Sequence, residues 1–91
     1  MDDERIRQKM GAVIRQLRKD KGLSQPALSK SGEEDQICDV GTLKRIEAGK
    51  HLPRPHTLYR IISMLDVSHE EFHNMVYGTD MRTFNNDFSI I

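Results

Sequence analysis

The side chains best suited to chemistry in this sequence are cationic and hydrogen-bonding groups gathered in one short segment. The segment contains Val40, Gly41, Thr42, Lys44 and Arg45. Lysine and arginine donate hydrogen bonds to guanine O6 and N7 or to phosphate oxygens, and a threonine hydroxyl can bond phosphate. Val40 could contact a thymine methyl group, and Gly41 would allow a backbone to approach closely. We interpret the segment as one that reads a DNA groove.

A second pattern, His-Glu-Glu-Phe-His at residues 69–73, has the spacing of a zinc site. Histidines four residues apart share a helix face, and the glutamate after the first can act as a general base. Asp80 and Asp87 are the only acids beyond the pattern, so no convincing third ligand follows. Metalloprotease activity and adventitious zinc binding are the alternatives. We expect no catalytic residues, no metal site, no cofactor and no enzymatic activity.

Length and composition limit the kind of protein this can be. A chain of 91 residues suits one small domain with a modest core. Its single cysteine cannot form an internal disulfide, as suits a reducing compartment. No segment approaches the roughly 20 apolar residues of a membrane span, and the basic start lacks the apolar part of a signal peptide. We therefore expect a cytoplasmic protein without a membrane partner.

Charge is segregated along the chain, although the formal net charge is zero. Residues 5–21 hold seven basic residues and one acid, and residues 44–60 hold five basic residues and one acid. The acids gather at residues 2–4, 33–35 and 70–71. Segregated charge can produce a basic face, and each phosphate that it neutralises releases counterions. The pattern indicates a polyanionic partner, with ordinary solvated helix faces as the alternative.

Apolar residues recur at spacings of three and four, which predicts helices throughout most of the chain. The five helices are expected at residues 3–21, from residue 25, at 40–48, at 55–65, and from 69 to a stop at Gly78. The last helix should bury Phe72, Met75 and Val76. Residues 79–91 fit no helical stripe, and we expect a tail, a short strand, a linker or an oligomerisation segment there.

Capping residues mark most of these helix ends. Ser24 and Asp39 are suitable N-caps, because their side-chain oxygens can accept a hydrogen bond from the first turn. Ser68 and Glu71 have the spacing of a capping box. Gly22 and Gly49 can adopt the left-handed conformation that ends a helix. The capped pair of helices around residues 25 and 40 is typical of a helix-turn-helix.

Three blocks of sequence, in order, carry a family resemblance. They are Ile14 to Gly22, Leu23-Ser24-Gln25, and Thr42 to Lys50. The chain resembles the DNA-binding domain of the Cro and C1 repressor family, often called the XRE family. The resemblance implies an all-α, compact five-helix bundle of the lambda-repressor-like helix-turn-helix type over residues 1–78, with residues 40–48 as the recognition helix in the major groove.

The resemblance also implies roles for single residues. Gln25 matches the glutamine that bonds phosphate and braces the recognition helix, with structural capping as the alternative. Arg18 and Glu47 match an ion pair that joins the first helix to the third, so we expect them to be structural. The expected DNA contacts are Gln25, Val40, Gly41, Thr42, Lys44, Arg45 and Lys50.

One departure from the common family pattern is a segment about four residues longer between Leu28 and Thr42, with the extra residues in Ser31 to Gln36. This segment, followed by Ile37-Cys38, is similar to the N-terminal domains of peptide-responsive regulators of the Rgg and PlcR type. The chain would then be a DNA-binding fragment without its peptide-sensing domain, or a stand-alone repressor. We expect Cys38 to be a buried apolar residue, with a redox switch as the alternative.

The function predicted from these patterns is sequence-specific binding of double-stranded DNA by a transcriptional regulator. Paired recognition helices suit an inverted repeat, so we expect a homodimer on DNA. The last helix and residues 79–91 are the expected dimer contact, and an unstructured end is the alternative. A protein-interaction module, such as an antitoxin or antirepressor with the same fold, is the alternative function.

Overall fold

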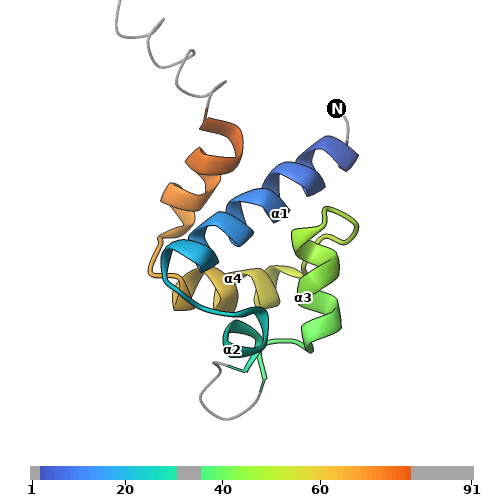
Figure 1. Ribbon diagram of the computed structural model, residues 1–91. Coiled ribbons are helices and arrows are strands. Elements are labelled where there is room, and N and C mark those ends of the chain that lie inside the picture. The colour runs from blue at the N-terminus through green and yellow to red at the C-terminus, as the bar shows by residue number, and fades with distance from the viewer. Residues whose placement is uncertain (1–2, 31–35, 79–91) are drawn as a thin grey trace, which may run out of the picture.

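The computed structural model describes residues 3–30 and 36–78, and all of its regular structure is helical in these ranges (Figure 1). The helices in chain order are α1 (Asp3–Asp20), α2 (Gln25–Ser29), α3 (Val40–Glu47), α4 (Pro55–Met64) and a fifth helix at residues 69–78. The predicted all-α fold with five helices is confirmed. Helices α1, α3 and α4 each end one residue before the predicted end. Most of the lengthened segment and residues 79–91 lie outside the described residues.

Helix α1 ends in the turn that glycine favours. Gly22 has φ +72°, and its N–H donates to the Lys19 carbonyl oxygen at 2.9 Å. The Leu23 N–H donates to the Arg18 carbonyl oxygen at 3.1 Å. These two bonds form a Schellman motif, which satisfies the last carbonyls of the helix and turns the chain toward α2.

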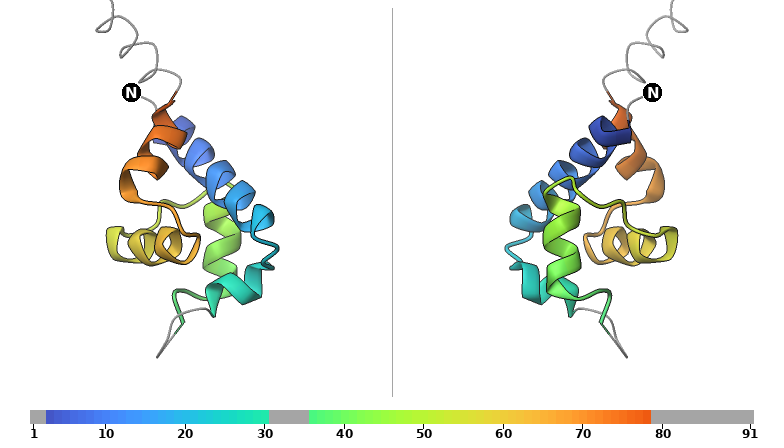
Figure 2. Two further views of the ribbon diagram at one scale, coloured as in Figure 1. Left: turned by 90° about the vertical axis from the view of Figure 1, so that its left-hand side faces the viewer. Right: turned by 90° about the vertical axis from the view of Figure 1, so that its right-hand side faces the viewer.

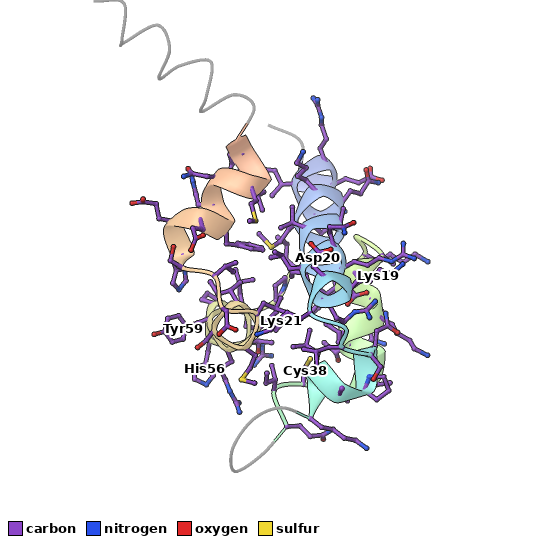
Figure 3. The ribbon with its side chains drawn as sticks, turned by 60° about the vertical axis from the view of Figure 1, so that its left-hand side comes forward. Lys19, Asp20, Lys21, Cys38, His56 and Tyr59 are labelled. Carbon is purple, nitrogen blue, oxygen red and sulfur yellow. The ribbon has the colours of Figure 1, made fainter. Side chains whose placement is uncertain are left out.

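Helix α4 ends in the same motif without a glycine. Asp66 has φ +60°, and its N–H donates to the Ser63 carbonyl oxygen at 3.2 Å. The Asp66 carboxylate also pairs with the Lys21 ammonium, which lies at the end of α1 (Figure 3). Aspartate tolerates the left-handed region better than most residues, so it can end the helix while linking two helix termini.

The fifth helix begins as predicted, but one of the side chains predicted to be buried is exposed. The Glu71 N–H donates to Ser68 Oγ at 3.0 Å, and the Ser68 N–H donates to Glu71 Oε1 at 3.1 Å, which completes the capping box. Gly78 is helical and lacks a positive φ, and the residues after it lie outside the described ranges, so the stop at Gly78 stays a prediction. Met75 is 42% exposed whereas Phe72 is 4% exposed. Because this helix packs at the edge of the bundle, only a narrow stripe of it is covered.

The core forms where α1 and α3 meet α2 and α4 (Figure 2). Its fully buried apolar side chains are Ile14, Leu28, Leu43, Ile46, Ile61 and Ile62. Helices α1 and α3 approach closely at Gly11, where an added Cβ would collide with the Ile46 carbonyl oxygen and lie 2.9 Å from the Glu47 carbonyl oxygen. The position of α3 therefore depends on backbone contact with α1. None of the described helices is long and apolar enough to span a membrane.

Candidate nucleic-acid interface

Helix α3 has one buried face and one accessible face. Leu43 and Ile46 are at most 1% exposed and pack in the core, while Lys44 and Arg45 are exposed. The other proposed contacts on this helix, Val40, Gly41 and Thr42, are half-buried at its first turn. Lys50 is exposed beyond its end, and Gln25 is half-buried at the start of α2. The structure thus brings five of the seven candidate residues onto one short helix.

A chain of hydrogen bonds runs along the accessible side of α3. The Thr42 N–H donates to Asp39 Oδ2 at 3.2 Å, which forms the N-cap. The Thr42 hydroxyl donates to Asp39 Oδ1 at 2.7 Å, and Arg45 Nη2 donates to Thr42 Oγ1 at 3.1 Å. The hydrogen bond from the Thr42 side chain, followed by that from its backbone, holds the pKa of Asp39 below its ordinary value.

The lowered pKa of Asp39 predicts an acid-dependent loss of stability. A depressed pKa stabilises the folded state above the ordinary aspartate pKa, and this contribution is lost as pH falls through the lowered folded value. We expect Asp39→Asn to be less stable than the native protein at neutral pH. The difference should shrink at strongly acid pH, because asparagine keeps the cap but not the charge. Urea unfolding across this range measures it, and parallel stability curves would contradict it.

The other end of α3 is held by a buried ion pair. Arg18 Nε donates to Glu47 Oε2 at 2.7 Å, and Arg18 Nη2 donates to Glu47 Oε1 at 3.0 Å. Their side chains are 9% and 3% exposed. Arg18 Nη1 also donates to the Leu23 carbonyl oxygen at 2.7 Å. This arrangement ties α1, the turn before α2 and α3 together.

Gln25 joins this network. Its Nε2 donates to Glu47 Oε1 at 3.0 Å, so the glutamine at the start of α2 contacts α3 directly. Ser24 caps α2 by accepting a hydrogen bond from the Ala27 N–H at 3.1 Å. The bracing expected of Gln25 is therefore present in the structure, and its contact with phosphate stays a prediction.

Comparison with known proteins identifies the fold to which this geometry belongs. Residues 9–75 match a family described as the helix-turn-helix domain. The chain belongs to this helix-turn-helix family. Its structure is similar to the crystal structure of the clp gene regulator ClgR from Corynebacterium glutamicum, with a TM-score of 0.72 and 21% identity over 92% of this chain and 86% of that one. No curated protein sequence matches the chain.

Helices α2 and α3 follow one another across a turn, in the order of the two helices of a helix-turn-helix motif. Membership of the helix-turn-helix family indicates DNA binding in transcription regulation. The XRE resemblance agrees broadly with this assignment.

The histidines of the zinc-like pattern pack against tyrosines in this helix-turn-helix domain. The His69 ring stacks on Tyr59 with centroids 5.0 Å apart, and His73 lies against Tyr77 with centroids 4.6 Å apart. Among the described residues, no group of three or more His, Cys, Asp and Glu side chains could hold a metal ion. The contacts and the capping role of Glu71 account for the pattern without a metal.

Cys38 lies on the segment that leads into α3 (Figure 3). Burial raises the pKa of its thiol above the ordinary value, the Asp39 carboxylate raises it further, and Arg60 opposes the rise. A redox switch requires an accessible thiolate of low pKa. The half-buried thiol instead packs against the core, as an apolar residue would.

The link between the N-cap and Arg45 was not predicted from the sequence. Asp39 was expected only to cap the helix and Thr42 only to contact DNA, whereas the structure joins both to Arg45. The available signal was spacing, since the three residues are three apart and so lie on one side of a helix. Spacing permits these contacts, but side-chain rotamers decide whether they form.

Proposed function

We propose that this protein is a sequence-specific regulator of transcription that binds double-stranded DNA with α3 in the major groove. The observation that carries the proposal is the division of α3 into two faces. Its inner face is held by Leu43, Ile46 and the Arg18–Glu47 pair, while its outer face presents Lys44 and Arg45. A recognition helix must be rigidly placed and must offer donors to base edges and phosphates.

The cations of the outer face are available to a polyanion. Within the described parts of the chain, neither Lys44 nor Lys50 forms an ion pair with an acidic side chain. Arg45 donates to the neutral hydroxyl of Thr42, and its charge also attracts the exposed Asp39 carboxylate, whose pKa it helps to lower, without forming an ion pair with it. Neutralising phosphates with such groups releases counterions and favours binding at low salt.

We further propose that the protein acts as a homodimer on an inverted repeat, because two-fold symmetry places two recognition helices about one turn of DNA apart. Helix 69–78, on which Met75 is exposed, is our proposed dimer contact together with residues 79–91, which lie outside the described residues. The kinship to peptide-responsive regulators of the Rgg and PlcR type stays a prediction, as does the separate peptide-sensing domain it implies.

Selection of duplexes from a random pool, followed by salt titration, tests the proposed function. We expect the native protein to enrich a related set of sequences, with log affinity falling linearly with log salt concentration. The double substitution Lys44→Ala/Arg45→Ala should weaken binding at least about tenfold, since it removes both donors of the outer face. Electrophoretic mobility shifts or fluorescence anisotropy would measure these affinities.

Lys21→Gln is the matched control, because it also removes a positive charge but from a side chain paired with Asp66 at the end of α4. Its salt dependence should equal that of the native protein. Failure of the native protein to enrich any duplex would refute sequence-specific binding and favour the protein-interaction alternative.

A further inference from the structure

We propose that Arg45 is the specificity-determining side chain of α3, that it reads a guanine, and that Thr42 and Asp39 are its positioning residues. The proposal rests on the proposed DNA-binding function and deepens it by dividing the outer face into a base-reading group and phosphate-binding groups. Lys44 belongs to the second kind.

The Arg45 side chain points toward the N-terminus of α3. Its Nη2 donates to Thr42 Oγ1 at 3.1 Å, one turn toward the helix N-terminus. Long side chains on helices lean toward the N-terminus, and residues three apart are neighbours on the surface. The guanidinium therefore lies over the first turn of α3, although Arg45 itself is in the second. In a helix-turn-helix, the N-terminal part of the recognition helix contacts the base edges.

Gly41 has no side chain and so leaves space beside the guanidinium of Arg45. A Cβ on Gly41 would lie 3.6 Å from Arg45 Nη1 and 3.1 Å from Asp39 Oδ2. A larger side chain at this position would compete with the guanidinium for the surface of the first turn. Gly41 thus leaves to the guanidinium of Arg45 the surface that a longer side chain at position 41 would cover.

No other side chain in the first turn of α3 is free to donate a hydrogen bond to a base. Val40 and Gly41 carry no polar side chain, and the Thr42 hydroxyl proton is given to Asp39 Oδ1 at 2.7 Å. Arg45 uses one N–H of its five on Thr42, so an edge of the guanidinium is left for guanine O6 and N7. A bidentate arginine is the commonest specific contact with guanine.

Arg45 and Lys44 differ in whether other side chains hold them in place. The Asp39–Thr42 chain holds Arg45 before DNA arrives, so less rotamer freedom is lost on binding. No side chain in the described part of the protein holds the Lys44 ammonium by a hydrogen bond or an ion pair. A flexible point charge suits phosphate, and a planar fork held in place suits a base pair.

The experiment uses the full chain and the duplex that it selects from a random pool. Affinities are measured for this duplex and for each of its single-base-pair substitutions, at several salt concentrations. The variants are Arg45→Lys, Thr42→Val, Thr42→Ser and Lys44→Ala. Arg45→Lys keeps the charge and removes the fork, and Thr42→Val keeps the shape and removes the hydroxyl.

Arg45→Lys should reduce the preference for one G·C pair by about 5- to 150-fold and leave the salt slope unchanged. Thr42→Val should reduce the preference at the same base pair by roughly 2- to 10-fold, and Thr42→Ser should retain it. Lys44→Ala should weaken all duplexes alike and reduce the salt slope by about one. Thermal unfolding checks that each variant is folded.

If Thr42→Val fails to fold, Asp39→Ser replaces it, because serine can cap the helix but cannot reproduce the carboxylate that holds Thr42. Asp39→Ser should lower the preference at the base pair that Arg45→Lys affects. The inference is overturned if Arg45→Lys weakens every duplex equally, or if the Thr42 and Asp39 variants leave that base pair unaffected. Either result leaves the proposed function intact, whereas a native protein that selects no duplex refutes the proposed function itself.

Discussion

Gly11→Ala should destabilise the folded protein by about 3 kcal/mol, near the upper end of the usual cost of overpacking. The added methyl group would meet the backbone carbonyls of Ile46 and Glu47, which cannot rotate away as a side chain can. Helices α1 and α3 would have to separate, which would also open the core between them. Alanine's better helix propensity offsets only about 1 kcal/mol of this cost. Urea unfolding followed by circular dichroism measures the change.

Gly78→Ala provides the matched control for this substitution. It also adds one methyl group to a helical glycine, but that group would have no atom of the described residues within 4 Å. We expect it to be neutral or to stabilise the protein by up to about 1 kcal/mol. If Gly11→Ala behaved like Gly78→Ala, α1 and α3 would have to be further apart in solution than the structure places them.

Glu47→Ala should cost about 3–5 kcal/mol, because it leaves a buried arginine without its partner. The Arg18 side chain is only 9% exposed, and two of its three hydrogen bonds go to Glu47. Gln25 would lose its acceptor at the same time. Removal of Glu47 therefore breaks the hydrogen bonds that join α3 to both α1 and α2. DNA affinity should fall with the loss of stability. Urea unfolding gives the free energy.

The double substitution Arg18→Met/Glu47→Leu should cost less than Glu47→Ala, since replacing both buried charges by apolar groups strands neither. The exposed Lys21–Asp66 pair is the matched control, with side chains 38% and 76% exposed. A double-mutant cycle on it should give a coupling of at most about 1 kcal/mol. Equal coupling for the two pairs would show that the Arg18–Glu47 pair is not the buried brace that we describe.

Local chemistry made the helix boundaries accessible from the sequence. Ser24, Asp39 and Ser68 cap helices because their side-chain oxygens reach an N–H three residues ahead, whatever surrounds them. Gly22 and Gly49 end helices because they adopt a positive φ without steric cost. These interactions span few residues, so patterns of residue type predict them. Glycine permits a helix end but does not require a left-handed one, and Gly78 is helical without a positive φ.

The Arg18–Glu47 pair, unlike the helix caps, joins residues that are far apart in the sequence. The partners are 29 residues apart, and family resemblance rather than periodicity predicts that they pair. The structure adds that Gln25 binds the same carboxylate, so the brace includes three elements. Long-range pairs of this kind depend on how the helices cross, and local patterns of residue type do not predict the crossing of helices.

The sequence by itself determined that the chain forms capped helices, with a helix that carries Lys44 and Arg45 following a short helix and a turn. It did so because capping and helical periodicity act over three or four residues. Only the tertiary structure decided that Gly11 sets the separation of α1 and α3, and that Asp66 ends α4 while pairing with Lys21. It also decided that Arg45 leans over Gly41 toward Thr42. How closely two helix backbones approach and which rotamer a side chain adopts depend on neighbours distant in the chain or on the space available. The order of the residues in the sequence does not specify either.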